Sequence, residues 1–356
     1  MISSHNDWDT LEECFVGIAD DVHHPPMDSS VMSFSYAGYD PNEVKDLKGR
    51  YPQWILDEAN EDLDNLAKTL EREGVIVHRP EPTNISAEFS TPDWKSHGWY
   101  NYCPRDLLLP LDNLIIDCPS AMRSRYFETM AYRSYLMGQM EEGVKWITAP
   151  KPRLLESLYT FEDLTQPTIT DDEIIFDAAN IVRLGKDLLF QVSNSGSKKG
   201  AMWLKTILEP LGYRVHLAEG FYAYTHFDST VVPLREGLVL FNGARLNENH
   251  YPSIFKNWDK MFFDDVVDIG SVLPNGVSPC SPYIGLNLLM VNPILAIVDE
   301  NQMELRRQLF RKGIDSIGLK MRHARSLSGG FHCVTLDVKR NGELQDYGLH
   351  NVSSSS

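Results

Sequence analysis

The sequence is poor in cysteine and in basic residues, and it lacks any long apolar run. Its five cysteines stand far apart and form no C-x-x-C pair, so neither a disulfide framework nor a zinc knuckle is expected. No stretch of about 18 consecutive apolar residues occurs, which argues against a membrane-spanning helix. Because 33 basic residues face 50 acidic ones, the formal net charge is −17. This charge argues against a nucleic-acid or anionic-membrane partner and weakly favours a cationic small substrate.

Length and the composition of the ends suggest a simple domain organisation. Residues Met1–Thr10 have neither a basic start nor an apolar core, so no secretory signal is expected and the cytoplasm is the default location. The 356 residues contain no long linker rich in proline, glycine or serine. We therefore expect one domain over residues 1–350 and a disordered tail over residues 351–356.

A recurring unit combines an amphipathic helix, a glycine and a short β-rich run. Its clearest copy has apolar residues at helical spacing over Trp54–Glu73, then Gly74, then a predicted strand over Val75–Val77. Further copies of helix and strand are predicted at Phe127–Glu142 with Val144–Thr148, Ala201–Leu211 with Tyr213–Leu217, Gln302–Lys312 with Ile314–Leu319, and, more weakly, Tyr251–Trp258 with Met261–Phe263.

Each unit also contains a predicted β-hairpin that begins near a polar or reactive residue. The strand that starts at Asp177 turns at Gly185–Asp187 and returns over Leu188–Val192. Corresponding hairpins start at Asp106, Asp228, Ser281 and Cys333. From Asp177 onward these starting residues recur at intervals of roughly fifty residues.

Five such units indicate an α/β fold closed into a ring, with the five starting residues directed toward one axis. For the last hairpin, the sequence predicts a turn at Lys339–Gly342. An ordinary α/β sandwich with similar turns is the alternative, and the spacing alone favours neither.

A reactive cysteine is the first candidate for chemistry. Cys333 follows Gly329 and Gly330, which let the backbone approach other groups closely. A cysteine nucleophile needs an acid or base nearby, and His332 would point to the opposite face if both residues lay on a strand. His226 and Asp228 are two residues apart, so on a strand they would share a face. Taken alone, Cys333 is more simply a buried structural thiol.

Several other charged residues are ambiguous on their own. Asp106 and Asp177 each stand beside an apolar run, and a buried carboxylate needs a partner. Such aspartates either form internal salt bridges or converge on a cationic ligand. Arg245 either binds a carboxylate or is a solvated surface residue.

Eight motifs along nearly the whole chain resemble those of the arginine-dependent amidinotransferases. They are N-D-W-D-T-L-E-E (Asn6–Glu13), S-T-P-D-W (Ser90–Trp94), C-P-R-D (Cys103–Asp106), M-R-S-R-Y-F-E (Met122–Glu128), A-P-K-P-R-L (Ala149–Leu154), F-D-A-A-N (Phe176–Asn180), H-F-D-S-T (His226–Thr230) and G-G-F-H-C-V-T-L-D-V-K-R (Gly329–Arg340). The resemblance implies the family fold, a pentein-like α/β propeller with five blades, each a ββαβ module. It also implies a homodimer and no cofactor or metal.

The resemblance implies roles for individual residues. Cys333 matches the family nucleophile, His226 its general acid/base and Asp177 the partner of that histidine. The positions matching substrate contacts are Asp106 and Asp228 for the donor guanidinium, Arg245 and Ser281 for the donor's carboxylate and amino end, and Cys280, where glycine-specific members carry a second serine.

These roles imply transfer of an amidino group from L-arginine to an amine, through an amidino-cysteine, with release of L-ornithine and ping-pong kinetics. Ala223 and Thr225 are smaller than the residues of glycine-specific members, so we expect an acceptor larger than glycine. An inosamine phosphate of the kind used in antibiotic biosynthesis fits best. Its phosphate could meet Lys198, Lys199 or Arg183, although these residues are more simply surface charges. L-Lysine (giving homoarginine), glycine or another natural-product amine, including one in toxin biosynthesis, remains an alternative acceptor.

Two other functional classes stay open at this point. An arginine deiminase-type hydrolase would use water as the acceptor and release citrulline and ammonia. A non-catalytic arginine-binding module would require loss of Cys333 or His226, and both residues are present.

Overall fold

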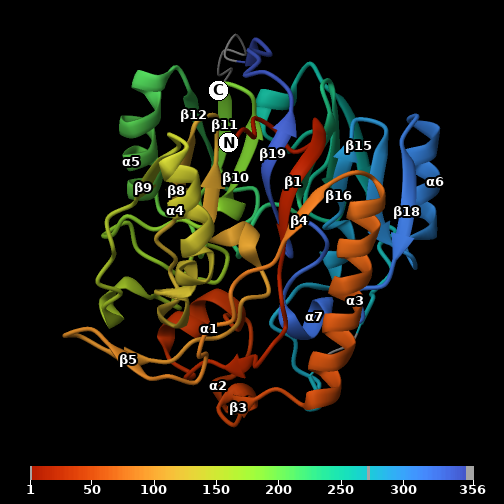
Figure 1. The fold of residues 1–356 in the computed structure, drawn as a ribbon. Helices are drawn as coiled ribbons and strands as arrows, with labels where there is room; N and C mark the ends of the chain where they lie inside the picture. The colour runs from red at the N-terminus through yellow and green to blue at the C-terminus, as the bar shows by residue number, and fades with distance from the viewer. Residues whose placement is uncertain (1, 271–272, 350–356) are drawn as a thin grey trace.

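Five three-stranded sheets form the framework of this mixed α/β protein (Figure 1). The computed structural model describes residues 2–270 and 273–349. The tail predicted over residues 351–356 lies outside the described residues. In the part of the chain that the structure covers, no helix is both long enough and apolar enough to cross a bilayer.

The five sheets share one pattern of strand pairing. In each, two strands pair antiparallel and a third lies parallel to the second of them. In this order the sheets are β7 (Leu108–Pro110), β8 (Leu114–Asp117) and β9 (Lys145–Thr148); β10 (Ile181–Leu184), β11 (Asp187–Gln191) and β12 (Arg214–Ala218); β13 (Val231–Arg235), β14 (Leu238–Asn242) and β15 (Asp259–Phe263); β16 (Leu289–Asn292), β17 (Leu295–Asp299) and β18 (Asp315–Leu319); and β19 (Thr335–Asn341), β1 (Thr10–Val16) and β4 (Ile76–His78). The predicted hairpin is confirmed in four of these sheets, whereas in the fifth β19 pairs with the N-terminal strand β1.

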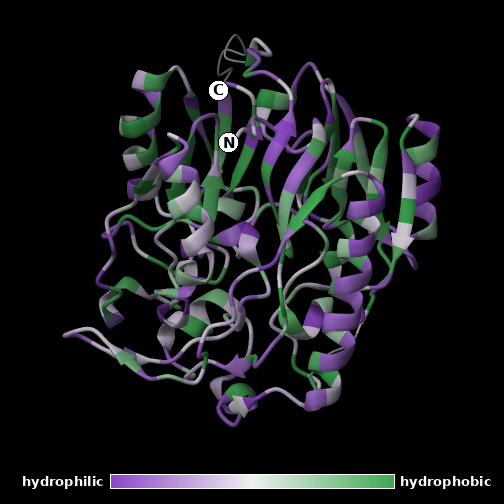
Figure 2. Cartoon of the chain, in the orientation of Figure 1, coloured by the Kyte–Doolittle hydropathy of each residue, from purple (hydrophilic) through white to green (hydrophobic). Residues whose placement is uncertain are grey.

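Helices connect the parallel strands in four of the five sheets. They are α3 (Gln53–Arg72), α4 (Arg133–Glu141), α5 (Lys198–Leu208) and α6 (Met303–Arg311). The apolar face of α3 is buried and the chain leaves the helix through Gly74 at φ 87°. Figure 2 shows a largely hydrophilic outer face on α3 and hydrophobic strands behind it.

Two predicted helices differ from the structure. The segment predicted as a helix over Phe127–Glu142 begins with a 3-10 turn over Glu128–Tyr132 before α4. The helix predicted over Tyr251–Trp258 is wrong, because only a 3-10 turn over Ser253–Phe255 forms there. A tight turn joins Asn247 to His250 and β15 begins at Asp259, so the intervening residues leave room for little more.

The last sheet is closed by the N-terminal strand. The turn predicted at Lys339–Gly342 is wrong, since β19 continues to Asn341 and pairs antiparallel with β1. This register places Cys14 opposite Asp337. The first and last strands of the chain therefore share one sheet.

Short elements gather at the end of the molecule away from the two termini (Figure 1). They are α1 (Ser29–Ser35), α2 (Pro41–Val44), the paired strands β2 (His23–His24) and β3 (Gly49–Arg50), the paired strands β5 (Phe89–Ser90) and β6 (Lys95–Ser96), and α7 (Ala324–Leu327). The carboxylate of Asp28 caps α1 by accepting hydrogen bonds from the backbone N–H groups of Ser30 and Val31.

A buried ion cluster joins three of the sheets. Asp337 on β19 is fully buried and accepts hydrogen bonds from Arg105, which precedes β7, and from Arg183 on β10 at 2.8 Å. Arg340 also donates to Asp337, at 2.5 Å. Although burial opposes its charge, these arginines hold the pKa of Asp337 well below its ordinary range.

We predict that Asp337→Asn lowers the free energy of unfolding by about 3–5 kcal/mol, because it leaves three buried guanidinium groups without their shared counter-charge. Chemical denaturation followed by circular dichroism measures this change. Asp315→Asn, at an exposed position on β18, is the matched control and should stay within about 0.5 kcal/mol of the parent. A loss below about 1 kcal/mol for Asp337→Asn would contradict the assigned role of the cluster.

Candidate active site

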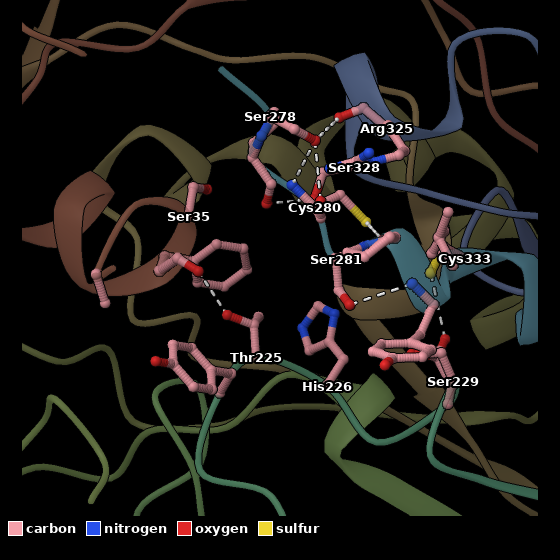
Figure 3. Close-up of a pocket in the computed structure, with 18 of the residues that line it drawn as sticks. Ser35, Thr225, His226, Ser229, Ser278, Cys280, Ser281, Arg325, Ser328 and Cys333 are labelled. Carbon is pink, nitrogen blue, oxygen red and sulfur yellow. Dashed lines mark hydrogen bonds between the residues drawn. The ribbon is translucent and has the colours of Figure 1, made fainter. Parts of the chain in front are cut away.

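One cavity of about 450 Å³ receives residues from the loops that precede the hairpins (Figure 3). Asp106, Asp228, Ser281 and Cys333 all line it. Asp177 lies behind the lining, where its carboxylate contacts the lining residue His226. The five residues predicted to start hairpins therefore do converge on one region.

The thiol of Cys333 shares a carboxylate with a histidine. Its Sγ donates to Oδ2 of Asp228 at 3.3 Å, and Nδ1 of His332 donates to the same oxygen at 2.8 Å. Burial opposes the charge of Asp228, but His332 lowers the pKa of this carboxyl to about 2. Burial, reinforced by the Asp228 charge, raises the pKa of Cys333 well above its ordinary value. The thiol therefore favours its protonated form beside the Asp228 carboxylate.

The expectation that His332 and Cys333 point to opposite faces is wrong. Both residues lie in a turn before β19, where strand alternation does not apply, and both reach Asp228. Nε2 of His332 also lies 3.8 Å from Oδ1 of Asp7. Burial and Arg105 oppose the charge of His332, but the two aspartates raise its pKa.

Asn287 and two glycines hold the backbone around Cys333. Oδ1 of Asn287 accepts hydrogen bonds from the backbone N–H groups of His332 and Cys333, each at 3.0 Å. A Cβ at Gly330 would lie 2.8 Å from Cβ of Asn287, and one at Gly329 would lie 2.5 Å from Sγ of Cys103. The close backbone approach predicted for the glycine pair is confirmed.

His226 is held between two carboxylates. Its Nε2 donates to Oδ2 of Asp177 at 2.8 Å, and its Nδ1 lies 3.5 Å from Oδ1 of Asp106. Burial opposes a charged imidazole, but Asp106 and Asp177 raise the pKa of His226 to about 9. We expected His226 and Asp228 to share one face of a strand. This expectation is wrong, because His226 has φ 56° and lies in the loop before β13. Both side chains nevertheless line the cavity.

Asp106 presents one carboxylate oxygen toward His226. Its Oδ2 accepts from Nη1 of Arg125 at 2.6 Å, and Arg125 also forms two hydrogen bonds with Glu128. Oδ1 is buried and has no hydrogen-bond partner within the described ranges. Burial raises the pKa of Asp106, although His226 and Arg125 oppose this rise. Asp106 thus places a carboxylate oxygen at the cavity wall, 3.5 Å from Nδ1 of His226.

Arg245 lines the cavity, so its interpretation as a solvated surface residue is wrong. Its guanidinium stacks on Tyr222, with the carbon 3.7 Å from the ring centroid. Nη1 donates to Oγ1 of Thr230 at 2.5 Å and Nη2 donates to Oγ of Ser281 at 3.0 Å. Burial lowers the pKa of Arg245.

The remaining predicted residues differ in their access to the cavity. Cys280 lines it, and burial raises the pKa of this thiol to about 12. Thr225 also lines it and donates to the backbone oxygen of Phe34 at 2.5 Å. Among described residues, Ala223 is not part of the lining, and its backbone oxygen accepts from the N–H of Asn194.

None of the three basic residues suggested for a phosphate belongs to the described lining of the cavity. Lys198 pairs with Glu219 at 2.6 Å, and Nζ of Lys199 donates to the backbone oxygen of Asp172. Arg183 is part of the buried ion cluster around Asp337. The simpler interpretation as surface charges holds for the two lysines.

Sequence reasoning missed several supports of this site. Asn287 and Arg125 contact the predicted residues Cys333 and Asp106 directly, and Glu128 contacts Arg125. Arg125 and Glu128 belong to the family motif M-R-S-R-Y-F-E, but the motif alone predicted no role for either residue. Asn287 is separated from Cys333 by three strands and two helices, and no local pattern connects the two.

Known proteins resemble the chain over almost its whole length, although no protein-family model matches it. It is 43% identical over 348 residues to inosamine-phosphate amidinotransferase 1 of Streptomyces glaucescens, covering 98% of this chain and 99% of that protein. It is 35% identical over 357 residues to the L-arginine:L-lysine amidinotransferase of Pseudomonas savastanoi pv. phaseolicola, covering 97% and 96%.

Solved structures agree with these matches. An inosamine-phosphate amidinotransferase from Streptomyces griseus superimposes with a TM-score of 0.94 at 44% identity, over 98% of this chain and 99% of that one. A dimethylarginine dimethylaminohydrolase superimposes with a TM-score of 0.58 at 14% identity, over 92% and 99%, and therefore shares the pentein-type fold alone. The family resemblance predicted from the motifs is confirmed: the chain belongs to the amidinotransferase family of enzymes.

Proposed function

We propose that this enzyme transfers the amidino group of L-arginine to an amine through a covalent intermediate on Cys333, and releases L-ornithine. The observation that carries the proposal is the shared cavity of Cys333, His226 and the carboxylates of Asp106 and Asp228. A thiol, an imidazole with a raised pKa and two carboxylates are the groups that attack on a guanidinium carbon requires.

Donor binding uses the two carboxylates and Arg245. Oδ1 of Asp106 and the carboxylate of Asp228 accept hydrogen bonds from the guanidinium and fix its plane beside sulfur. Arg245, together with Ser281, holds the α-carboxylate and amino end of the donor, and Cys280 stands beside them. The thiol of Cys333 is protonated before the donor binds, and the bound cation favours its ionisation, with the proton lost to solvent.

In the first half-reaction the Cys333 thiolate forms a bond to the guanidinium carbon. The bond from that carbon to Nε of arginine breaks, and His226 gives its proton to this nitrogen as ornithine leaves. In the second half-reaction the nitrogen of the acceptor amine bonds to the same carbon. His226, now neutral, takes a proton from the amine, and the carbon–sulfur bond breaks to return the thiolate. Asp177 orients the imidazole through the hydrogen bond at Nε2.

We further propose an inosamine phosphate as the acceptor. Support comes from the higher identity to inosamine-phosphate amidinotransferases, 43% against 35% for the lysine-specific relative. The small side chain of Thr225 on the cavity wall also leaves space for an acceptor larger than glycine. L-Lysine is the second candidate, because Arg245 would hold its α-carboxylate after ornithine has left.

The sheet contacts support a five-bladed ring built as one domain. Contacts between β10 and β13, between β1 and β16, and between β19 and β7 join neighbouring sheets. Apolar side chains of β13 and β16 share one core cluster. The 3-10 turns before β7 and β10 contact each other as well, which completes the circuit. Following the family, we also propose a homodimer.

Cys333→Ala should reduce ornithine release from arginine to a trace, because no other group forms the covalent bond. Chromatographic assay of ornithine measures this loss. Cys14→Ala, which removes a buried thiol on β1 outside the described lining of the cavity, is the control and should retain most activity. Substantial turnover by Cys333→Ala would exclude the covalent route.

The first half-reaction should lose rate as pH rises through about 9, because a neutral His226 has no proton for the leaving nitrogen. Asp177→Asn removes a carboxylate that raises the pKa of His226. In this variant the basic limb of the pH–rate profile for the first half-reaction should therefore move to lower pH. The rate at neutral pH should fall by about 10²–10⁴-fold. Rapid-quench measurement of ornithine across pH tests both changes. An unchanged limb would contradict the role of Asp177, and Asp172→Asn, at an exposed position, is the control.

Mass spectrometry of products formed from labelled arginine and separate amines should rank inosamine phosphate above lysine, and lysine above glycine. The expected order follows from the space beside Thr225 and from Arg245. A preference for glycine would contradict the proposed acceptor. Comparable citrulline formation without any amine would instead indicate a hydrolase.

A further inference from the structure

A second arginine lines the cavity without a part in the reaction described above. Among the described lining residues, Arg245 and Arg325 are the two with a permanent positive charge. The proposed function assigns Arg245 to the donor. Arg325, on α7, remains unassigned although the acidic chain has little other positive charge to offer an anionic ligand here.

Arg325 lies at the end of the cavity away from His226. Figure 3 shows it beside Ser278 and Ser328, with Cys280 and Ser281 between this group and His226. Oγ of Ser278 donates to the backbone oxygens of Cys280 and Arg325, at 2.9 and 3.0 Å. These hydrogen bonds fix the arginine-bearing segment against the loop that carries the donor-binding residues.

The guanidinium of Arg325 has capacity for another anion. Nη1 donates to Oδ2 of Asp268 at 2.6 Å, but the Asp268 side chain is half exposed, so this pair contributes little. Nε is buried and, within the part of the chain described, has no hydrogen-bond partner. A guanidinium offers five N–H donors in a planar fork that matches phosphate oxygens.

A hydroxyl group on the opposite wall is a further hydrogen-bonding group at this end of the cavity. Ser35 lines the cavity, and its buried Oγ lacks a hydrogen-bond partner in the described ranges. Figure 3 places Ser35 across the opening from Cys280. The combination of one cation and one neutral hydroxyl suits an anionic group on a ligand whose other end reaches Cys333.

We propose that Arg325 binds the phosphate of a phosphorylated amine acceptor and so sets the preference for phosphorylated over unphosphorylated amines. The inference rests on the proposed function, because the acceptor amine must lie beside Cys333 and His226. The phosphate then occupies the Arg325 end, and Arg245 is left to the donor. This arrangement assigns the two arginines to different half-reactions.

The test compares kcat/KM for inosamine phosphate with kcat/KM for unphosphorylated inosamine. In Arg325→Gln this ratio should fall by about 10- to 100-fold, the usual effect of losing one charge-assisted contact. Arg325→Lys keeps the charge without the planar fork and should give an intermediate ratio. Arg311→Gln removes the same charge from a side chain that is 71% exposed on α6, and should leave the ratio at the parental value.

Inorganic phosphate separates recognition of the phosphate group from recognition of the whole acceptor. It should inhibit the parent competitively against inosamine phosphate, and inhibit Arg325→Gln at least tenfold more weakly. A ratio unchanged in both Arg325 variants, with ornithine still released from arginine, would overturn this inference alone. Absence of ornithine release by the parent enzyme would instead overturn the proposed function.

Discussion

Three buried aspartates around one cavity are the constraint on which the site depends. A buried carboxylate is stable only beside positive charge or hydrogen-bond donors. Arg125 supplies the charge for Asp106, His226 for Asp177 and His332 for Asp228. These pairs raise the pKa values of both histidines and lower that of Asp228. The protonated state of His226 therefore follows from the requirement to bury acids.

The fold meets this constraint by bringing distant loops to one place. Each of the five sheets begins just after a loop that contributes to the site, so residues more than one hundred positions apart contact each other. The ion cluster around Asp337 joins three of these sheets. His332 links the site to this ion cluster. It bonds to Asp228 in the site and approaches Asp7, whose carboxylate pairs with Arg183 in the cluster. Sheet packing and the ionisation of the site are thus physically connected.

Local patterns predicted the features whose causes are local. The helical spacing around Leu63, the positive φ of Gly74 and the hairpin after Asp177 are encoded within short segments. Contacts across the sequence were not available to such patterns. The pairing of β19 with β1 replaced the turn predicted at Lys339–Gly342, because distant strands complete the last sheet.

The residues of the site divide in the same way, into those that short motifs predict and those that only tertiary packing brings to the site. Motif resemblance placed Cys333, His226 and the aspartates, and the structure brings them together. It did not reveal Asn287 as the acceptor for the Cys333 backbone N–H, nor Arg325 in the lining, because both depend on tertiary packing. The assumption of a strand around His332 failed for a local reason, since the turn before β19 lets adjacent side chains reach one carboxylate.

Intact-protein mass spectrometry after acid quenching with excess arginine, and no amine present, tests the central claim most directly. The account predicts that the protein gains the mass of one amidino group and that peptide mapping places it on Cys333. Consumption of arginine with no such adduct at any quench time would contradict the account.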